Sequence, residues 1–253
     1  EGDALAYGVV VGGFLQSLIL VPSLIKLGFF PRFSLATFGT FLRNKDAKRV
    51  WKNMIPGMLG MGLMQITTLI NTQFASSLGE GTITYLYLAD RLLELPLSLI
   101  SVSMGAALLP TLSLHWTQKN KTTMLNTANY YFRLNIYSAV PAAVGLVFLA
   151  QPIVELLYMR NKFTLQDAVM TASIVRIYGL TLIASSCVRV LVPSFYAIKN
   201  TWLPATVSGL CLLVHIFLAP VLMGRYGVQG LVFSTAISAG LNLLFLILFH
   251  YWI

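Results

Sequence analysis

The chain has 253 residues, of which 57% are hydrophobic and only 10% are charged. Soluble globular domains carry about 25% charged residues, so this chain has too little charge to cover a surface that faces water. The mean hydropathy of +0.78 agrees. The net charge of +9 would suit a nucleic acid, but the cations are concentrated in one loop between apolar blocks, which indicates a membrane surface instead.

The chain contains no signature of an enzyme. It has no GxSxG, HExxH or Walker A motif, and its cysteines, Cys187 and Cys211, lie in apolar blocks without a CxxC spacing. We therefore expect no catalysis, no cofactor and no bound metal. Any transport would draw its energy from an ion gradient, the membrane potential or substrate flux. Because residue 1 is Glu1 and not Met, we expect the chain to begin inside a longer protein.

Apolar blocks near the length of about 20 residues that crosses a bilayer recur along the whole chain. Almost continuously apolar stretches such as Leu241–Phe249 favour helices over barrel strands, because barrel strands alternate apolar and polar residues. The predicted fold class is therefore an all-α integral membrane protein with about seven transmembrane helices. The predicted spans are 4–27, 53–77, 83–112, 127–150, 168–195, 203–223 and 228–250.

Basic residues predict the orientation of these spans. The segment 26–52 holds seven Lys or Arg residues and one acid, Asp46. Lys119, Lys121 and Lys199 follow the third and fifth spans and fall on the same side. The positive-inside rule makes that side cytoplasmic, so the first span runs inward and the C-terminus is also cytoplasmic.

The basic loop carries a helical pattern of its own. From Asp46 onward, apolar residues recur at helical spacing between cations, which predicts a short interfacial amphipathic helix that ends in a break at Pro56 and Gly57. A simple basic flank of the second span is the alternative. Either structure would anchor the protein at the membrane.

Three charged residues lie inside the third predicted span, where charge is costly. Asp90 and Glu94 are four residues apart and Arg91 and Glu94 three, so all three share one broad helix face. Arg91 lies roughly 13 Å from the outer loop at 1.5 Å rise per residue, too deep to reach that interface easily. We predict a water-filled cavity in which its guanidinium grips an anionic group such as phosphate. A neutralised cluster that only joins helices is the alternative.

Other polar residues of the spans are expected to be structural. Pro96 predicts a kink. Arg133 and Arg189 lie near cytoplasmic ends, which snorkelling explains, and Arg176 is expected to be an anchor. His215 is expected to be a hydrogen-bonded structural histidine. Interhelical hydrogen bonding is the expected role, with cavity lining as the alternative, for Gln65, Thr67, Thr68 and Asn71.

Seven stretches carry a resemblance to a known family. They are Gly12–Gln16, Gln65–Ser76, Tyr85–Pro96, Leu109–Ser113, Pro141–Gly145, Pro193–Ala197 and Gly227–Leu231. On these residues the chain resembles the lipid II flippase family, the MurJ/MviN group of the multidrug/oligosaccharidyl-lipid/polysaccharide exporter superfamily. The Ala-Asp-Arg-Leu segment is specific to that family, whereas Phe-Tyr-Ala and Gly-Val-x-Gly occur more widely in the superfamily.

The resemblance implies a larger architecture. Family members have two six-helix lobes that face a central cavity, followed by a final helix pair. By this likeness, residues 1–27 are the last helix of the first lobe, 28–52 form the basic cytoplasmic loop with its interfacial helix, and 53–253 form the second lobe. The rest of the first lobe and the final helix pair, which this chain lacks, are then its expected partners in the full-length protein.

The resemblance also implies a substrate site. In the family, arginines that line the cavity bind the pyrophosphate of a lipid-linked disaccharide-pentapeptide. Arg91 matches one of these arginines, and Asp90 and Glu94 match acids close to it. The partner arginines belong to the first lobe.

A second implied site is degenerate. Some relatives hold sodium between second-lobe helices with carboxylates. The matching positions here carry no acid, so we expect no sodium coupling; they are Asn71, His215, Ala219 and Thr235.

The resemblance finally implies a function: a multi-pass flippase of the bacterial inner membrane that moves lipid II to the outer leaflet by alternating access. Its partners would be lipid II and membrane lipids, and no nucleic acid. Three alternatives remain. They are an ion-driven exporter of drugs or other polysaccharide-linked lipids, a non-transporting scaffold, and a fragment that is inactive alone. Arginines in the first lobe would favour lipid II, and carboxylates there would favour a cation-coupled exporter.

Overall fold

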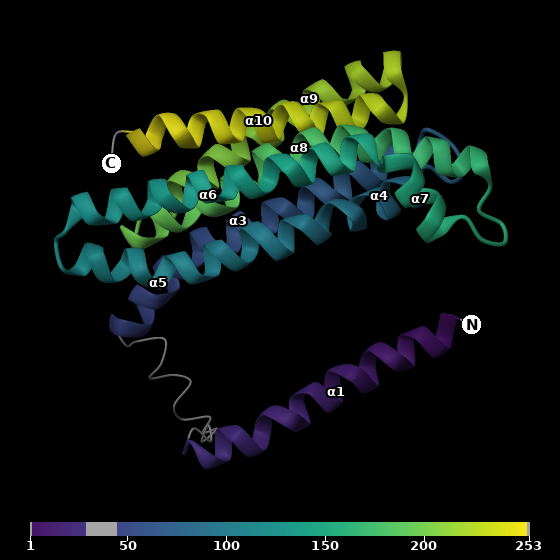
Figure 1. The fold of residues 1–253 in the computed structure, drawn as a ribbon. Coiled ribbons are helices and arrows are strands. Elements are labelled where there is room, and N and C mark those ends of the chain that lie inside the picture. The colour runs from purple at the N-terminus through teal and green to yellow at the C-terminus, as the bar shows by residue number, and fades with distance from the viewer. Residues whose placement is uncertain (1, 29–44, 252–253) are drawn as a thin grey trace. The chain divides into compact units, whose positions relative to one another are not determined.

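The structure is a computed structural model that describes the backbone of residues 2–28 and 45–251 and most of their side chains. Every regular element in these two ranges is helical (Figure 1). The elements are α1 (Gly2–Lys26), α3 (Lys45–Ser76), α4 (Thr82–Pro96), η1 (Leu97–Val102), α5 (Ser103–Thr117), α6 (Lys121–Phe148), α7 (Ala150–Tyr158), α8 (Leu165–Ala197), α9 (Trp202–Tyr226) and α10 (Val228–Tyr251).

The chain divides into two compact units, Glu1–Trp51 and Lys52–Ile253. In the first unit, the described side chains of α1 from Tyr7 onward are all exposed. A helix that is apolar all round is stable only when lipid or another protein segment surrounds it. This property agrees with the membrane span predicted at 4–27.

The second unit is built around α8. This helix contacts α4, η1, α5, α6, α7, α9 and α10, and α6 and α10 run along it in Figure 1. Its buried side chains extend from Ala168 to Ala197, and Ile174, Leu182 and Phe195 among them are each at most 1% exposed. They contribute to all three apolar clusters of the bundle. The helix that is buried on the most sides therefore fixes the positions of its neighbours.

Six stretches of the described residues are long and apolar enough to cross a bilayer, which confirms the predicted fold class. The predicted span 53–77 falls in α3, a helix of 32 residues that is not one of the six. That helix carries polar residues along its length and stays a predicted span. The six stretches are Tyr7–Lys26, Thr82–Thr117, Lys121–Phe148, Leu165–Ala197, Trp202–Tyr226 and Val228–His250.

The irregularity predicted at Pro96 is a π-helical stretch, η1, that begins with the next residue. A proline lacks the N–H that the helical ladder needs, and a π-helical turn is one way to shift that ladder. A buried polar chain holds η1 in place. Ser101 donates to Asn135 of α6 (3.0 Å), and Asn135 donates to Ser186 of α8 (3.2 Å). These hydrogen bonds satisfy polar groups that have no access to water.

Two details of the predicted helices are wrong. The backbone of α3 is helical from Lys45 to Ser76, so the break predicted at Pro56 and Gly57 does not occur. A membrane helix tolerates the loss of one backbone hydrogen bond at a proline. Lys45 onward belongs to α3, and the rest of the predicted basic loop, 29–44, lies outside the described residues. The short helix α7 was also not predicted.

Gly230 marks the tightest helix contact and gives a first prediction. A Cβ atom built on Gly230 would lie 2.1 Å from the carbonyl oxygen of Leu222 on α9. Because that oxygen is backbone, α9 and α10 would have to separate. We expect Gly230→Ala to lower the free energy of unfolding by about 2 kcal/mol or more.

The matched control is Gly145→Ala in α6, where nothing lies within 4 Å of the added Cβ. Alanine also favours helix over glycine, so this variant should be as stable as the parent or slightly more so. Thermal unfolding of the detergent-purified variants measures both. Equal melting temperatures for the two variants would contradict the close contact between α9 and α10.

Candidate functional site

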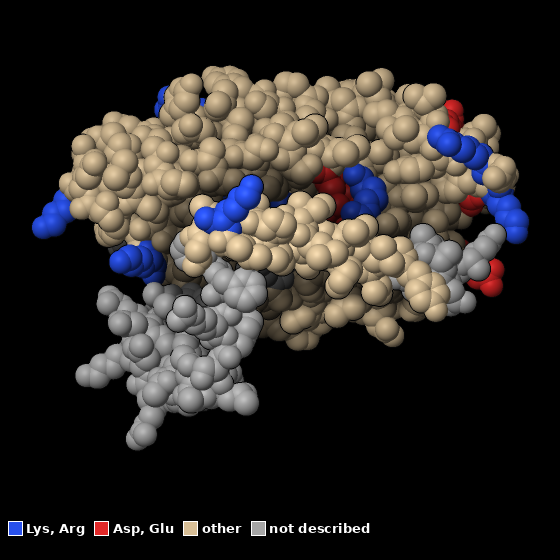
Figure 2. Space-filling model, turned by 90° about the horizontal axis from the view of Figure 1, so that it is seen from below, with Lys and Arg blue, Asp and Glu red and all other residues tan. Residues whose placement is uncertain are grey.

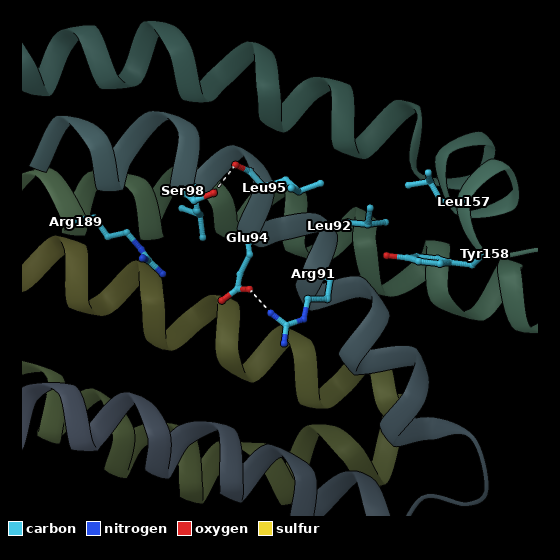
Figure 3. Close-up of a pocket in the computed structure, with 9 residues that line it drawn as sticks. Arg91, Leu92, Glu94, Leu95, Ser98, Leu157, Tyr158 and Arg189 are labelled. Carbon is cyan, nitrogen blue, oxygen red and sulfur yellow. Dashed lines mark hydrogen bonds and ion pairs between the residues drawn. The ribbon is translucent and has the colours of Figure 1, made fainter. Parts of the chain in front are cut away.

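A cavity of about 410 Å³ lies beside the predicted charged cluster (Figure 3). Its walls come from α4 and η1 on one side and from α7 and α8 on the other. The charged members are Arg91 and Glu94 from α4 and Arg189 from α8. The others are Leu92, Leu95, Leu97, Ser98, Leu157 and Tyr158.

Arg91 is held by two partners on its own helix. Its Nη1 donates to Oε2 of Glu94 at 2.8 Å, and its Nη2 donates to the hydroxyl of Tyr87 at 3.1 Å. The guanidinium carbon also lies 4.8 Å from the centre of the Tyr87 ring. The side chains of Arg91 and Glu94 remain 55% and 52% exposed. Since a guanidinium has five N–H donors, Arg91 is oriented by its neighbours yet keeps donors for another acceptor.

A second cavity, of about 380 Å³, lies between α3, α4, α8, α9 and α10. Asp90 faces this second cavity, while Glu94 and Arg189 line both. The three charged residues predicted to form one cluster, Asp90, Arg91 and Glu94, therefore do not all line the same cavity. Arg91 and Glu94 form an ion pair, and no hydrogen bond or ion pair joins Asp90 to either of them within the described chain.

Few other charged residues surround the charged group. Figure 2 shows a largely tan surface, with a group of red and blue atoms together in its central part. Hydroxyl and amide side chains from four helices, α3, α8, α9 and α10, line the second cavity. The four α3 residues for which interhelical hydrogen bonding was expected all line it, namely Gln65, Thr67, Thr68 and Asn71.

One histidine joins three helices at the wall of the second cavity. His215 of α9 is 1% exposed, and its Nε2 lies 2.8 Å from Oδ1 of Asn71 on α3. Its Nδ1 lies 3.0 Å from Oγ of Ser234 on α10. His215 is therefore hydrogen-bonded, as expected. Ser234 makes the contact to α10, whereas the predicted Thr235 donates to the carbonyl of Leu231 on its own helix.

The other positions of the predicted degenerate ion site do not converge on His215. Ala219 is fully buried in the apolar core. In the described ranges, no three His, Cys, Asp or Glu side chains lie close enough together to hold a metal ion. His215, Asn71 and Ser234 thus form an interhelical lock, and the expected loss of sodium coupling at this degenerate site stays a prediction.

Known proteins place the chain in a family. The family model described as "Lipid II flippase MurJ" matches residues 1–251. The chain belongs to the MurJ lipid II flippase family. A probable lipid II flippase MurJ of Bdellovibrio bacteriovorus is 50% identical over 242 residues, which cover 96% of this chain and 45% of that protein. The lipid II flippase MurJ of Burkholderia cenocepacia is 33% identical over 97% of this chain and 47% of its own length.

Solved structures agree with membership of the MurJ family. A lipid II flippase MurJ in an inward closed conformation matches with a TM-score of 0.76 and 26% identity, over 95% of this chain and 49% of that chain. A multidrug resistance transporter of the MATE family matches with a TM-score of 0.69 and 15% identity, over 87% and 48%. The second likeness shows the fold alone. The chain spans about half the length of the MurJ relatives that it matches.

Arg189 is a cavity residue that the sequence did not reveal. Its place near the predicted cytoplasmic end of a span suggested snorkelling, but its partly buried side chain lines both cavities. In the sequence, Arg189 lies two helical turns after Leu182 in an apolar block. That spacing does not show that α4 brings Glu94 to the cavities that Arg189 lines. Arg133 and Arg176, by contrast, are exposed and line neither cavity.

The histidine lock gives a second prediction. His215→Ala would remove the interhelical partner of Oδ1 of Asn71 and leave the buried Oγ of Ser234 with only the carbonyl of Leu231 on its own helix. We expect a loss of stability of about 1 kcal/mol or more, measured as a lower melting temperature in detergent. His115→Ala in α5, a partly buried histidine outside this network, is the matched control. An unchanged melting temperature for His215→Ala would show that the lock contributes nothing to stability.

Proposed function

We propose that this chain is one half of a flippase that moves lipid II from the cytoplasmic to the outer leaflet of the bacterial inner membrane. The observation that carries the proposal is Arg91, an oriented and accessible guanidinium on a cavity wall within a membrane-spanning stretch. Membership of the MurJ family supports the identity of the substrate. The product is the same lipid on the other side of the membrane, so no bond is made or broken.

In this proposal Arg91 holds the pyrophosphate of the headgroup. The cavity beside it supplies both parts that such a ligand needs, since Arg91 offers charge-assisted hydrogen bonds to phosphate and leucines form much of the remaining wall. Glu94 orients Arg91 through their ion pair. Asp90 faces the neighbouring cavity and would keep excess positive charge from building up around the site.

The remaining half of the path would come from the longer protein. We assign residues 1–27 to the last helix of the first lobe, 28–52 to a basic cytoplasmic loop and 53–253 to the second lobe. The division into compact units after Trp51 supports this assignment. A first lobe and a final helix pair would then complete the cavity, and the two lobes would rock to open it alternately to each side. The bundle around α8 suits a rigid lobe, because one helix contacts seven neighbouring elements.

Arg91→Ala tests the proposal in a full-length setting. This chain replaces the matching half of the Bdellovibrio bacteriovorus relative, and the hybrid is expressed in bacteria depleted of their own flippase. The unsubstituted hybrid should restore labelling of lipid II at the outer leaflet. Arg91→Ala should reduce that labelling by at least about tenfold, because charge-assisted hydrogen bonds to the headgroup are lost, and the precursor should accumulate in the inner leaflet.

Arg176→Ala is the control, since Arg176 is an exposed arginine of α8 outside both cavities. It should leave outward labelling unchanged. Membrane levels of each hybrid are measured by immunoblot, so that a loss of protein is not mistaken for a loss of transport. Normal outward labelling by the Arg91→Ala hybrid would overturn the assigned role of Arg91.

A further inference from the structure

Arg189 is a partly buried cation for which no hydrogen bond or ion pair of the side chain is found in the described chain. Burying part of a guanidinium is costly unless an acceptor or an opposite charge compensates it. Asp90 lies within electrostatic reach of Arg189 but outside ion-pair distance, so it compensates the buried charge only diffusely. Arg189 is therefore a cation that has space for a carboxylate or another anion beside it.

Glu94 stands between two arginines. Figure 3 shows its carboxylate paired with Arg91 on one side, while the guanidinium of Arg189 points toward it from the other. Glu94 and Arg189 line both cavities, but Arg91 lines only the first. A glutamate side chain changes partners by rotating about its own bonds, and Arg189 is the cation that shares both cavities with Glu94.

The charges of the first cavity show what such an exchange would do. Its walls carry Arg91, Arg189 and Glu94. While Glu94 pairs with Arg91, its carboxylate holds one Nη1 donor and neutralises the guanidinium, so Arg91 attracts an incoming phosphate less strongly. With Glu94 on Arg189, the guanidinium of Arg91 is free for the phosphate, and the carboxylate still has a cation. Neither position leaves Glu94 unpaired.

We propose that Glu94 is a transferable counter-ion, which neutralises Arg91 in the empty site and moves to Arg189 when an anionic phosphate group binds Arg91. Arg189 is then a positioning residue that receives Glu94 and does not touch the ligand. This inference rests on the proposed role of Arg91 in headgroup binding. It adds a specificity device, because an uncharged lipid could not displace Glu94 and would find the charge of Arg91 neutralised.

A double-mutant cycle for ligand binding tests the transfer. The 253-residue chain in lipid nanodiscs is titrated with farnesyl diphosphate, and farnesol is the uncharged comparison. Arg189→Gln should weaken diphosphate binding roughly tenfold, the size of one partly screened charge interaction, because Glu94 loses its second cation. Glu94→Gln should bind the diphosphate more tightly than the parent chain, because Arg91 has no competing carboxylate.

The two substitutions should not be additive. The Glu94→Gln chain has no carboxylate at position 94 with which Arg189 could pair. Adding Arg189→Gln to it should therefore change the dissociation constant by less than about twofold. Arg189→Lys keeps the cation and should restore most of the affinity. Arg176→Gln, an exposed arginine of the same helix, should bind as the parent does. Thermal unfolding of every variant verifies that it is folded.

Two other results for Arg189→Gln would contradict the transfer of Glu94. If Arg189→Gln weakens binding equally with and without Glu94, Arg189 is a direct phosphate ligand and the transfer is wrong. If Arg189→Gln weakens binding neither in the parent chain nor in the Glu94→Gln chain, Glu94 does not move to Arg189 and the transfer is also wrong. The proposed headgroup contact fails separately, in a different variant, if Arg91→Gln binds farnesyl diphosphate as well as the parent chain.

Discussion

The cost of placing charge inside a membrane governs this structure. A carboxylate or guanidinium in a span must be paired, hydrated or placed at a cavity. Arg91 and Glu94 meet two of these conditions, since they pair with each other and line a cavity. An ion pair that only joined helices would have its two partners on different helices, whereas this pair lies within α4. Its position therefore favours a role toward a ligand over a role in packing.

That charged site depends on an apolar scaffold that can hold it. The scaffold is centred on α8, whose buried side chains pack against most other elements. Some polar groups inside it are joined by interhelical hydrogen bonds, as between Ser101, Asn135 and Ser186 and around His215. Unpaired polar groups would be costly at these depths. The same constraint thus shapes both the packing and the site.

Much of the fold could be predicted because span length and apolar composition are properties of consecutive residues. Arg91 and Glu94 could also be paired in advance, since three residues in a helix define a shared face. Contacts between distant segments left no such signal. Nothing in the sequence around Arg189 shows that it lines the same cavities as Glu94. Ser234 and Thr235 are neighbours that point in different directions, and only the packing of α9 on α10 shows which one meets His215.

The most direct test is a cryo-electron microscopy structure of the full-length hybrid, which carries this chain as its second half, with a bound polyprenyl diphosphate. The proposed headgroup site predicts a phosphate oxygen within about 3 Å of a guanidinium nitrogen of Arg91, with the carboxylate of Glu94 turned away from it. A diphosphate bound elsewhere in the cavity, with the ion pair between Arg91 and Glu94 intact, would contradict the account.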